Sequence, residues 1–207
     1  MLYIYEDLDR TGDDFLEKIS ILLSEQRFDK VQKLRFIQGK NASAVVYLLL
    51  RLALRDEYGI NEPVEFVYSG KGKPTLKNHP HIHFNLSHSS NTAVCAVAES
   101  NIGVDVQKIT TVNDNVAKRV LTAEEYLIFN NTGNPGEYFC EIWTIKESYF
   151  KLTGQGISEE FRNLSADSVD KKMVYKGNDY FCCVCGPAAQ ALPVKHVRRN
   201  DIEQLLY

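Results

Sequence analysis

The segment WTIKESYFKLTGQG, residues 143–156, constrains the fold of this chain more than any other stretch. At the helical period, apolar residues fall on both sides, with Trp143 and Phe150 on one side and Ile145, Tyr149 and Leu152 on the other. A helix that is apolar all round is usually buried, so Lys146, Glu147 and Lys151 need partners in or beside a core. The alternative is an exposed amphipathic helix in which Glu147 and Lys151 form an ordinary i, i+4 pair.

A second segment, SNIGVDVQKI at residues 100–109, adds a candidate cation site. Its alternation predicts a strand with Asp105 and Gln107 on one face. Magnesium prefers oxygen ligands and is usually held by one or two carboxylates together with water and substrate phosphate. Asp105 and Glu147 are the candidate carboxylate ligands, and Gln107 offers a neutral oxygen.

Composition narrows the class of protein. The chain has 207 residues, of which 44% are hydrophobic and 25% charged, as expected for one soluble domain or two small fused ones. A net charge of -3 argues against nucleic-acid binding. We expect a cytoplasmic protein without a membrane segment, because the chain has neither a long apolar run nor a signal-like start. The five cysteines are odd in number and irregularly spaced, which favours buried reduced thiols over disulfides or zinc.

Periodicity and capping signals predict the order of the elements. Helices are expected over 11–23, 25–37, 42–58, 123–130 and 136–153, with a helical turn over 202–207. Strands are expected over 2–5, 92–99, 102–109, 173–175, 180–185 and 194–197. The strands at 92–99 and 102–109 are separated by two residues and are interpreted as a hairpin. Thr122 and Glu125 form the pattern of a capping box.

Four motifs occur together in one order. They are GKP at 72–74, FNLSHS at 84–89, IGVDVQ at 102–107 and the helix at 143–156. In this order they resemble the 4'-phosphopantetheinyl transferase superfamily, specifically its surfactin-synthetase-activating type. The resemblance implies an α+β fold of two similar α/β halves related by a pseudo-two-fold, with the active site in the cleft between them. A faint repeat of helices in 24–59 and 122–156 agrees with two halves.

The resemblance also assigns roles to residues. The N-terminal half, 1–100, would supply the coenzyme A-binding elements, and the C-terminal half, 101–207, the metal site and the catalytic helix. Coenzyme A phosphates would be contacted by Arg27, Lys30, Lys73, Ser87, His88, Lys146 and Lys151. Mg²⁺ would be held by Asp105, Gln107 and Glu147. Glu147, Lys151 and Lys146 would be catalytic, with Glu147, or a metal-bound water beside it, as the base.

The sequence departs from the family pattern at two positions. Gln107 replaces a glutamate at the metal site, and Ser43 stands where many members have an arginine that reaches coenzyme A. A nearby lysine, Lys40, is a candidate substitute for that arginine. Both departures bear on metal and substrate affinity.

The implied reaction transfers 4'-phosphopantetheine from coenzyme A to a serine of an apo acyl or peptidyl carrier protein and releases 3',5'-ADP. Fatty-acid, polyketide and nonribosomal-peptide carriers all remain open as partners, with Val116, Lys118 and Arg119 as candidate contacts, and a monomer is expected. One alternative is a catalytically weak homologue that binds coenzyme A or a carrier protein. Another is a metal-dependent phosphohydrolase that uses water at Asp105 and Glu147.

Overall fold

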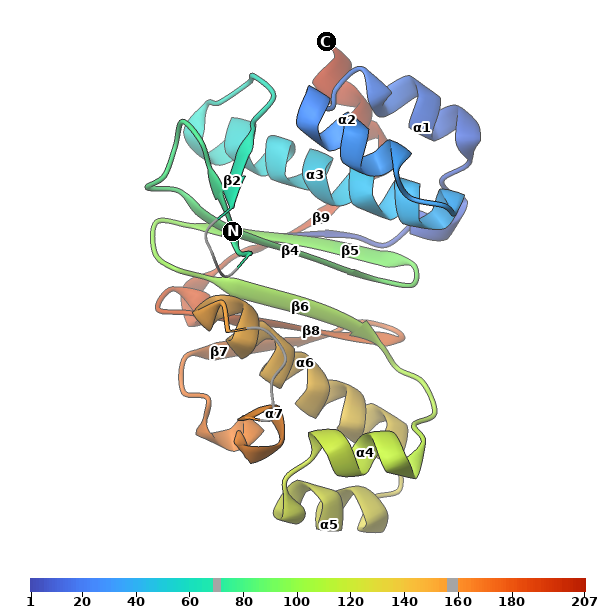
Figure 1. Ribbon diagram of the computed structural model, residues 1–207, viewed down its shortest axis with the longest axis vertical. Coiled ribbons are helices and arrows are strands. Elements are labelled where there is room, and N and C mark those ends of the chain that lie inside the picture. The colour runs from blue at the N-terminus through green and yellow to red at the C-terminus, as the bar shows by residue number, and fades with distance from the viewer. Residues whose placement is uncertain (69–71, 156–159) are drawn as a thin grey trace.

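The computed structural model describes residues 1–68, 72–155 and 160–207 and has an α+β fold (Figure 1). The predicted turn residues Gly70 and Lys71 and the predicted helix-ending Gly156 lie outside the described residues. The strands are β1 (Leu2–Tyr5), β2 (Phe66–Tyr68), β3 (Pro74–Leu76), β4 (His83–Ser89), β5 (Thr92–Ala98), β6 (Gly103–Lys108), β7 (Lys172–Lys176), β8 (Tyr180–Cys185) and β9 (Val194–Val197). The helices are α1 (Asp13–Ser20), α2 (Glu25–Gln32), α3 (Ile37–Tyr58), α4 (Asp114–Val120), α5 (Ala123–Asn131), α6 (Pro135–Thr153), α7 (Glu160–Asn163) and α8 (Arg199–Glu203).

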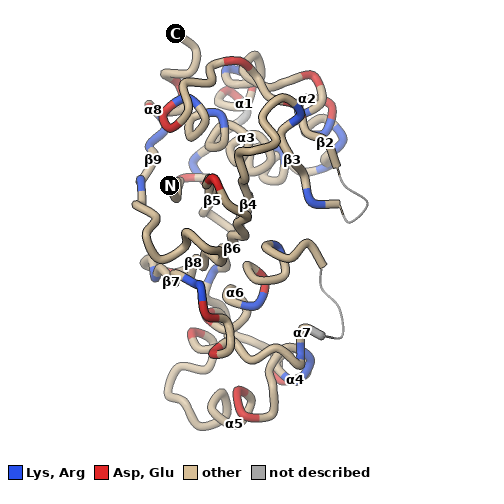
Figure 2. The backbone as a smooth tube through the Cα atoms, turned by 90° about the vertical axis from the view of Figure 1, so that its left-hand side faces the viewer, with Lys and Arg blue, Asp and Glu red and all other residues tan. Residues whose placement is uncertain are grey.

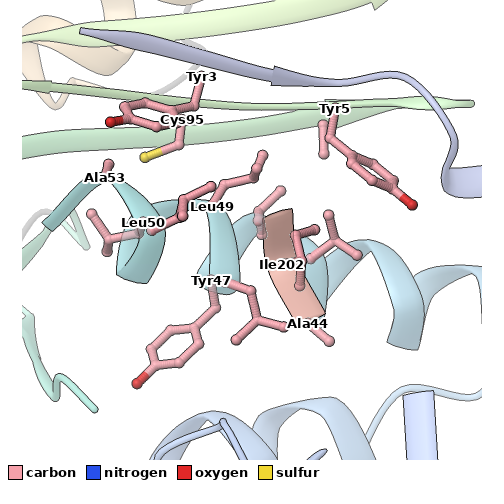
Figure 3. Close-up of a cluster of buried hydrophobic side chains, with 14 of the residues drawn as sticks. Tyr3, Tyr5, Ala44, Tyr47, Leu49, Leu50, Ala53, Cys95 and Ile202 are labelled. Carbon is pink, nitrogen blue, oxygen red and sulfur yellow. The ribbon is translucent and has the colours of Figure 1, made fainter. Parts of the chain in front are cut away.

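The first half is built on the sheet β4-β5-β1-β9, in which β1 runs antiparallel to β5 and parallel to β9. The long helix α3 covers one face of this sheet because its central residues are almost all apolar and buried. Figure 3 shows the packing, with Leu49 and Leu50 of α3 below Tyr3 and Cys95 of the strands. Gly59 ends α3 in the left-handed conformation with φ 67°, as its position predicts.

The second half is built on the sheet β6-β8-β7, and α6 covers its outer face. Gly103 permits close contact, because a Cβ at this position would clash with the backbone of Ser148 and Leu152. Aromatic rings fill the space beside α6, and Phe150 stacks on Phe161 with centroids 5.1 Å apart. The helix is buried on most sides, as its sequence predicts, and ends at Gly154.

The two sheets stack on each other through apolar side chains. The contact residues include Leu2, Ile4, Val94 and Ala96 from the first sheet and Val104, Val106, Cys182 and Val184 from the second. The order of layers is therefore α3, first sheet, second sheet, α6, which Figure 2 shows from the side. The pseudo-two-fold relation stays a prediction, but both halves place one long helix on the outer face of a sheet.

The predicted hairpin is wrong. Strand β5 pairs with β4 and β1, whereas β6 pairs with β8, so the two strands lie in different stacked sheets. Both strands are buried on both faces over most of their length, which two stacked sheets allow and a solvated hairpin does not.

The last segment of the chain lies in the first half of the molecule, although the predicted division at residues 100 and 101 assigns it to the second. Strand β9 joins the first sheet beside β1, and Ile202 of α8 packs in the core around α3. The chain therefore returns to the first half after completing the second. Helix α4, which the sequence analysis did not predict, precedes α5. All five cysteines are buried and free, as expected. Within the described ranges, the helices are too short or too polar to cross a membrane.

Candidate functional site

A pocket of about 420 Å³ opens in the first half between α2, α3, β2 and β4. Four of the residues predicted to bind coenzyme A line it, namely Arg27, Lys30, Ser87 and His88. The sequence analysis did not identify the apolar part of its wall, formed by Leu34, Val46, Phe66, Tyr68, Pro74 and Leu86. These residues come from α3, β2, β3, β4 and the segment between α2 and α3, and only the fold brings them together. The pocket combines cationic and apolar groups, as a nucleotide-containing anion requires.

Arg27 is held rigidly in this pocket. Its guanidinium lies 5.2 Å from the ring centroids of both Tyr47 and Phe66, and its Nη1 donates a hydrogen bond to Ser43 Oγ at 3.2 Å. Burial lowers the pKa of Arg27. Arg27 is therefore not solvated as an ordinary surface arginine is, because the N-cap Ser24 starts α2 so that Arg27 points inward. Ser43 therefore orients Arg27.

Beside the pocket, Ser87 connects the two halves. Ser87 Oγ donates to Asp105 Oδ1 at 2.8 Å, and Lys151 Nζ donates to both Ser87 Oγ at 2.9 Å and Asp105 Oδ1 at 2.6 Å. Ser87 ends in the pocket wall, Asp105 comes from β6 and Lys151 from α6. The structure therefore places Lys151 and Asp105 in contact with Ser87 of the pocket wall.

The carboxyl group of Asp105 is only partly satisfied. Its side chain is 7% exposed, and within the described part of the chain its buried Oδ2 has no hydrogen-bond partner. A buried carboxylate oxygen without a partner is costly unless a cation or another donor reaches it. This oxygen is the feature of the structure that fits a bound metal ion.

Glu147 lies one helical turn before Lys151 on α6 and is half-buried. Burial raises the pKa of Glu147, the charge of Asp105 raises it further, and Lys151 opposes the shift. The pKa of His88, at the exposed rim of the pocket, is lowered because nearby atoms displace water and Lys151 repels a second positive charge. Burial is thus the main cause of both pKa shifts, and the charges of Asp105 and Lys151 modify them.

Gln107 is half-buried on the same strand, two residues after Asp105. Its backbone carbonyl accepts a hydrogen bond from Cys140 Sγ at 3.1 Å, which ties this end of β6 to α6. No cluster of three or more His, Cys, Asp or Glu side chains suited to a metal occurs within the described ranges. A site at Asp105 and Glu147 therefore has two carboxylates, and the amide of Gln107 is the third candidate ligand. Such an oxygen set suits Mg²⁺, which commonly keeps several waters.

Lys146 lies away from the pocket and from Asp105, beside Glu125 of α5. Its side chain is 0% exposed, and its Nζ donates to Glu125 Oε2 at 2.6 Å and to the Val120 carbonyl at 2.8 Å. Glu125 also closes the predicted capping box with Thr122 and accepts from the backbone N–H of Ala166. The structure does not bring Lys146 to the site, because these contacts hold its ammonium group within the second half. Adjacent residues on a helix point about 100° apart, so Glu147 and Lys146 cannot share a face.

Lys73 is also engaged by protein atoms. Its Nζ donates to Asn101 Oδ1 at 2.6 Å, to the Ile102 carbonyl at 3.1 Å and to the Leu152 carbonyl at 3.1 Å. Its neighbours in the sequence, Gly72 and Pro74, line the pocket. The side chain of Lys73 therefore turns from the pocket wall toward the second half.

Comparison with known proteins agrees with this site. Residues 101–186 match the family model of the 4'-phosphopantetheinyl transferase superfamily. The chain is 30% identical to 4'-phosphopantetheinyl transferase gsp of Aneurinibacillus migulanus, over 83% of this chain and 72% of that protein. It is 29% identical to 4'-phosphopantetheinyl transferase psf-1 of Bacillus pumilus, over 76% of this chain and 69% of the relative. It is 27% identical to 4'-phosphopantetheinyl transferase Sfp of Bacillus subtilis (strain 168), over 69% of this chain and 65% of that protein. From these matches and the shared motifs, the chain belongs to the 4'-phosphopantetheinyl transferase superfamily.

Proposed function

We propose that this protein transfers 4'-phosphopantetheine from coenzyme A to a serine hydroxyl of an apo acyl or peptidyl carrier protein, with Mg²⁺, releasing 3',5'-ADP. One observation carries the proposal: a pocket with cationic and apolar walls leads through Ser87 to the partly satisfied Asp105 and to Lys151. Family membership supports the transferase class.

The pocket would bind the nucleotide part of coenzyme A. Arg27, Lys30 and His88 supply groups that bind phosphate, while Phe66 and Tyr68 supply aromatic surface for a nucleobase. Arg27 is fixed by its two ring contacts and by Ser43, so little side-chain entropy is lost when it binds an anion. Ser87, at the end of this pocket, would mark the position of the pyrophosphate.

Asp105 and Glu147, with the amide of Gln107, would hold Mg²⁺. When bound, this ion would neutralise charge on the phosphate oxygens. Lys151 would bring a cation to the same oxygens from its position 2.6 Å from Asp105 Oδ1. The carboxylate of Glu147 would accept the proton of the carrier serine.

The carrier protein would dock on the surface of α4 and α5 beside the catalytic helix. Val116, Leu127 and Ile128 expose 43%, 65% and 50% of their surface there. Lys118 and Arg119, in the last turn of α4, add positive charge. Carrier proteins present the modified serine at the start of an acidic helix, which complements apolar and basic side chains. Both parts of the site come from one chain, so we expect a monomer to act, in the cytoplasm.

The proposal is tested by intact-mass spectrometry of apo carrier proteins incubated with this protein, coenzyme A and Mg²⁺. The expected result is a gain of one phosphopantetheine, abolished by EDTA and by Glu147→Ala. Carriers from fatty-acid, polyketide and nonribosomal-peptide synthesis form the panel. Binding of coenzyme A without a gain on any carrier would indicate a binding homologue instead. Release of free phosphopantetheine without a carrier would indicate a phosphohydrolase.

A further inference from the structure

The ammonium group of Lys73 makes a complete set of contacts with the second half of the molecule. A lysine ammonium has three N–H donors. In this structure it donates to Asn101 Oδ1, to the Ile102 carbonyl and to the Leu152 carbonyl, at 2.6, 3.1 and 3.1 Å. All three acceptors are uncharged oxygens, and burial lowers the pKa of Lys73. A phosphate ligand would require Lys73 to break at least one of these bonds.

One of the acceptors lies at the C-terminal end of α6. Carbonyl groups in the last turn of a helix have no intrahelical partner, and a lysine near them also interacts favourably with the helix dipole. The Leu152 carbonyl accepts from both Lys73 Nζ and Asn101 Nδ2, the latter at 2.8 Å. Lys73 and Asn101 together therefore cap the helix from outside.

The capped end of α6 also carries the residues of the candidate site. Lys151 directly precedes Leu152, and Glu147 lies one turn earlier on α6. The backbone of Lys73 lies beside the pocket, because its neighbours Gly72 and Pro74 line the pocket wall. Lys73 thus connects the wall of the proposed coenzyme A pocket to the end of the catalytic helix.

We propose that Lys73 is a positioning residue that holds Lys151 and Glu147 in place relative to the coenzyme A pocket, rather than a ligand of a coenzyme A phosphate. The inference rests on the proposed transferase function, but its binding part does not depend on transfer. The two roles predict different effects of removing the lysine. Loss of a phosphate ligand weakens coenzyme A binding, whereas loss of a positioning residue leaves binding unchanged and lowers the rate of the step that follows.

The test compares Lys73→Met with Lys30→Met by calorimetric titration with coenzyme A in the absence of any carrier protein. We expect Lys30→Met to weaken coenzyme A binding about tenfold or more, as loss of a charged hydrogen bond does. We expect Lys73→Met to leave the Kd for coenzyme A within about twofold. A rise in that Kd comparable with the rise for Lys30→Met would overturn the proposal.

The rate is measured in the same variants with an apo carrier protein. Lys73→Met should lower kcat about tenfold or more with little change in the KM for coenzyme A, because small misplacements of catalytic groups are costly. Hydrogen exchange should quicken at the amide of Gly154, which bonds the Phe150 carbonyl in the last turn of α6. Unchanged kcat and unchanged exchange would also overturn the proposal.

Asn101→Ala is the milder second variant if Lys73→Met does not fold. It removes one acceptor of Lys73 and one donor to Leu152, and it leaves the lysine available to bind a phosphate. The positioning role predicts lower kcat and faster exchange at Gly154 with an unchanged Kd for coenzyme A. Tighter coenzyme A binding in Asn101→Ala, from a lysine released toward the pocket, would contradict it. If no carrier is modified even by the natural protein, the transferase proposal fails, while the titration and exchange still decide the role of Lys73.

Discussion

The two lysines of helix α6 each pair with a carboxylate, and the two pairs are alike in distance and different in surroundings. Lys146 contacts Glu125 and Lys151 contacts Asp105, each with 2.6 Å between nitrogen and oxygen. The side chain of Lys146 is 0% exposed, whereas that of Lys151 is 29% exposed beside the pocket. The two pairs lie on different faces of one helix and belong to different layers of the fold.

The oxygens of the two carboxylates separate a structural pair from a functional one. Glu125 Oε2 accepts from Lys146 and from the backbone of Thr122, and its Oε1 accepts from the backbone of Ala166. Asp105 Oδ1 has two donors, but Oδ2 is buried without a partner in the described residues. A fully satisfied buried pair fixes neighbouring elements, while an incompletely satisfied one retains the capacity to bind a cation or substrate.

The largest expected effect comes from breaking the structural pair. Lys146→Met should lower the free energy of unfolding by about 3–5 kcal/mol, because it leaves the Glu125 carboxylate buried without its cation. Urea unfolding of the variant and of the natural protein measures this difference. Adding Glu125→Gln to Lys146→Met should recover part of the loss, since a neutral amide can still accept from the backbone. Failure of the second change to recover stability would mean that buried charge is not the cause.

The same substitution in the second pair should act on catalysis. Lys151→Met is expected to slow transfer about 10²–10³-fold, the usual effect of removing one group that stabilises charge in the transition state. Its loss of stability should be less than half that of Lys146→Met, because water reaches this lysine and Ser87 still bonds Asp105. Single-turnover transfer at saturating coenzyme A, with urea unfolding in parallel, makes the comparison. Equal losses of stability in the two variants would remove the distinction.

Metal binding should stabilise one pair only. With coenzyme A present throughout, Mg²⁺ at about 100 times its Kd should add about 2.7 kcal/mol to the stability of the natural protein relative to EDTA. Asp105→Asn should abolish this increment, whereas Lys146→Met should retain it despite a lower baseline. Thermal unfolding at fixed concentrations gives the measurement. A full increment in Asp105→Asn would exclude Asp105 as a ligand.

The acidity of Glu147 gives a smaller effect on rate. Burial and Asp105 raise the pKa of Glu147, so its carboxylate is protonated at a higher pH than that of an ordinary glutamate. If it is the base, kcat should fall about tenfold per pH unit below that raised pKa and level off above it. The pH profile of single-turnover transfer shows this limb. The fall of kcat at low pH should disappear in Glu147→Gln. If the fall persists in this variant, another group is responsible for it.

The contrast between the two pairs also shows what the sequence could reveal. Motifs and periodicity predicted α6, its glycine end and the strand that carries Asp105, because apolar patterning and capping are local properties. They also predicted that Glu147, Lys151, Ser87 and His88 act in one region. The capping box at Thr122 identified Glu125 correctly but gave no sign of its partner.

The other features of the fold and the site depended on tertiary packing and could not be predicted from local sequence. That Lys146 turns to Glu125 follows from the placement of α5 beneath α6, which no local pattern encodes. The spacing between Thr92 and Lys108 suggested a hairpin, but strands buried on both faces were better satisfied in two stacked sheets. The inward orientation of Arg27 and the turn of Lys73 toward α6 likewise required the positions of distant elements.

The smallest expected effect concerns the neutral side chain at the metal site. Gln107 lies on the strand face of Asp105, at a position where the family resemblance predicts a glutamate, so Gln107→Glu adds one negative charge close to the proposed ion. An added charge about 4 Å away contributes about 1 kcal/mol for each unit of the ion's charge in a water-like environment, so the Mg²⁺ midpoint for transfer should be lower by at least about fivefold. The measurement is initial rate against Mg²⁺ concentration at saturating coenzyme A. Glu141→Gln, which removes a charge elsewhere on α6, is the matched control and should leave the midpoint unchanged. If Gln107→Glu also leaves it unchanged, Gln107 is not a ligand, and Asp105 and Glu147 are the protein's ligands on their own.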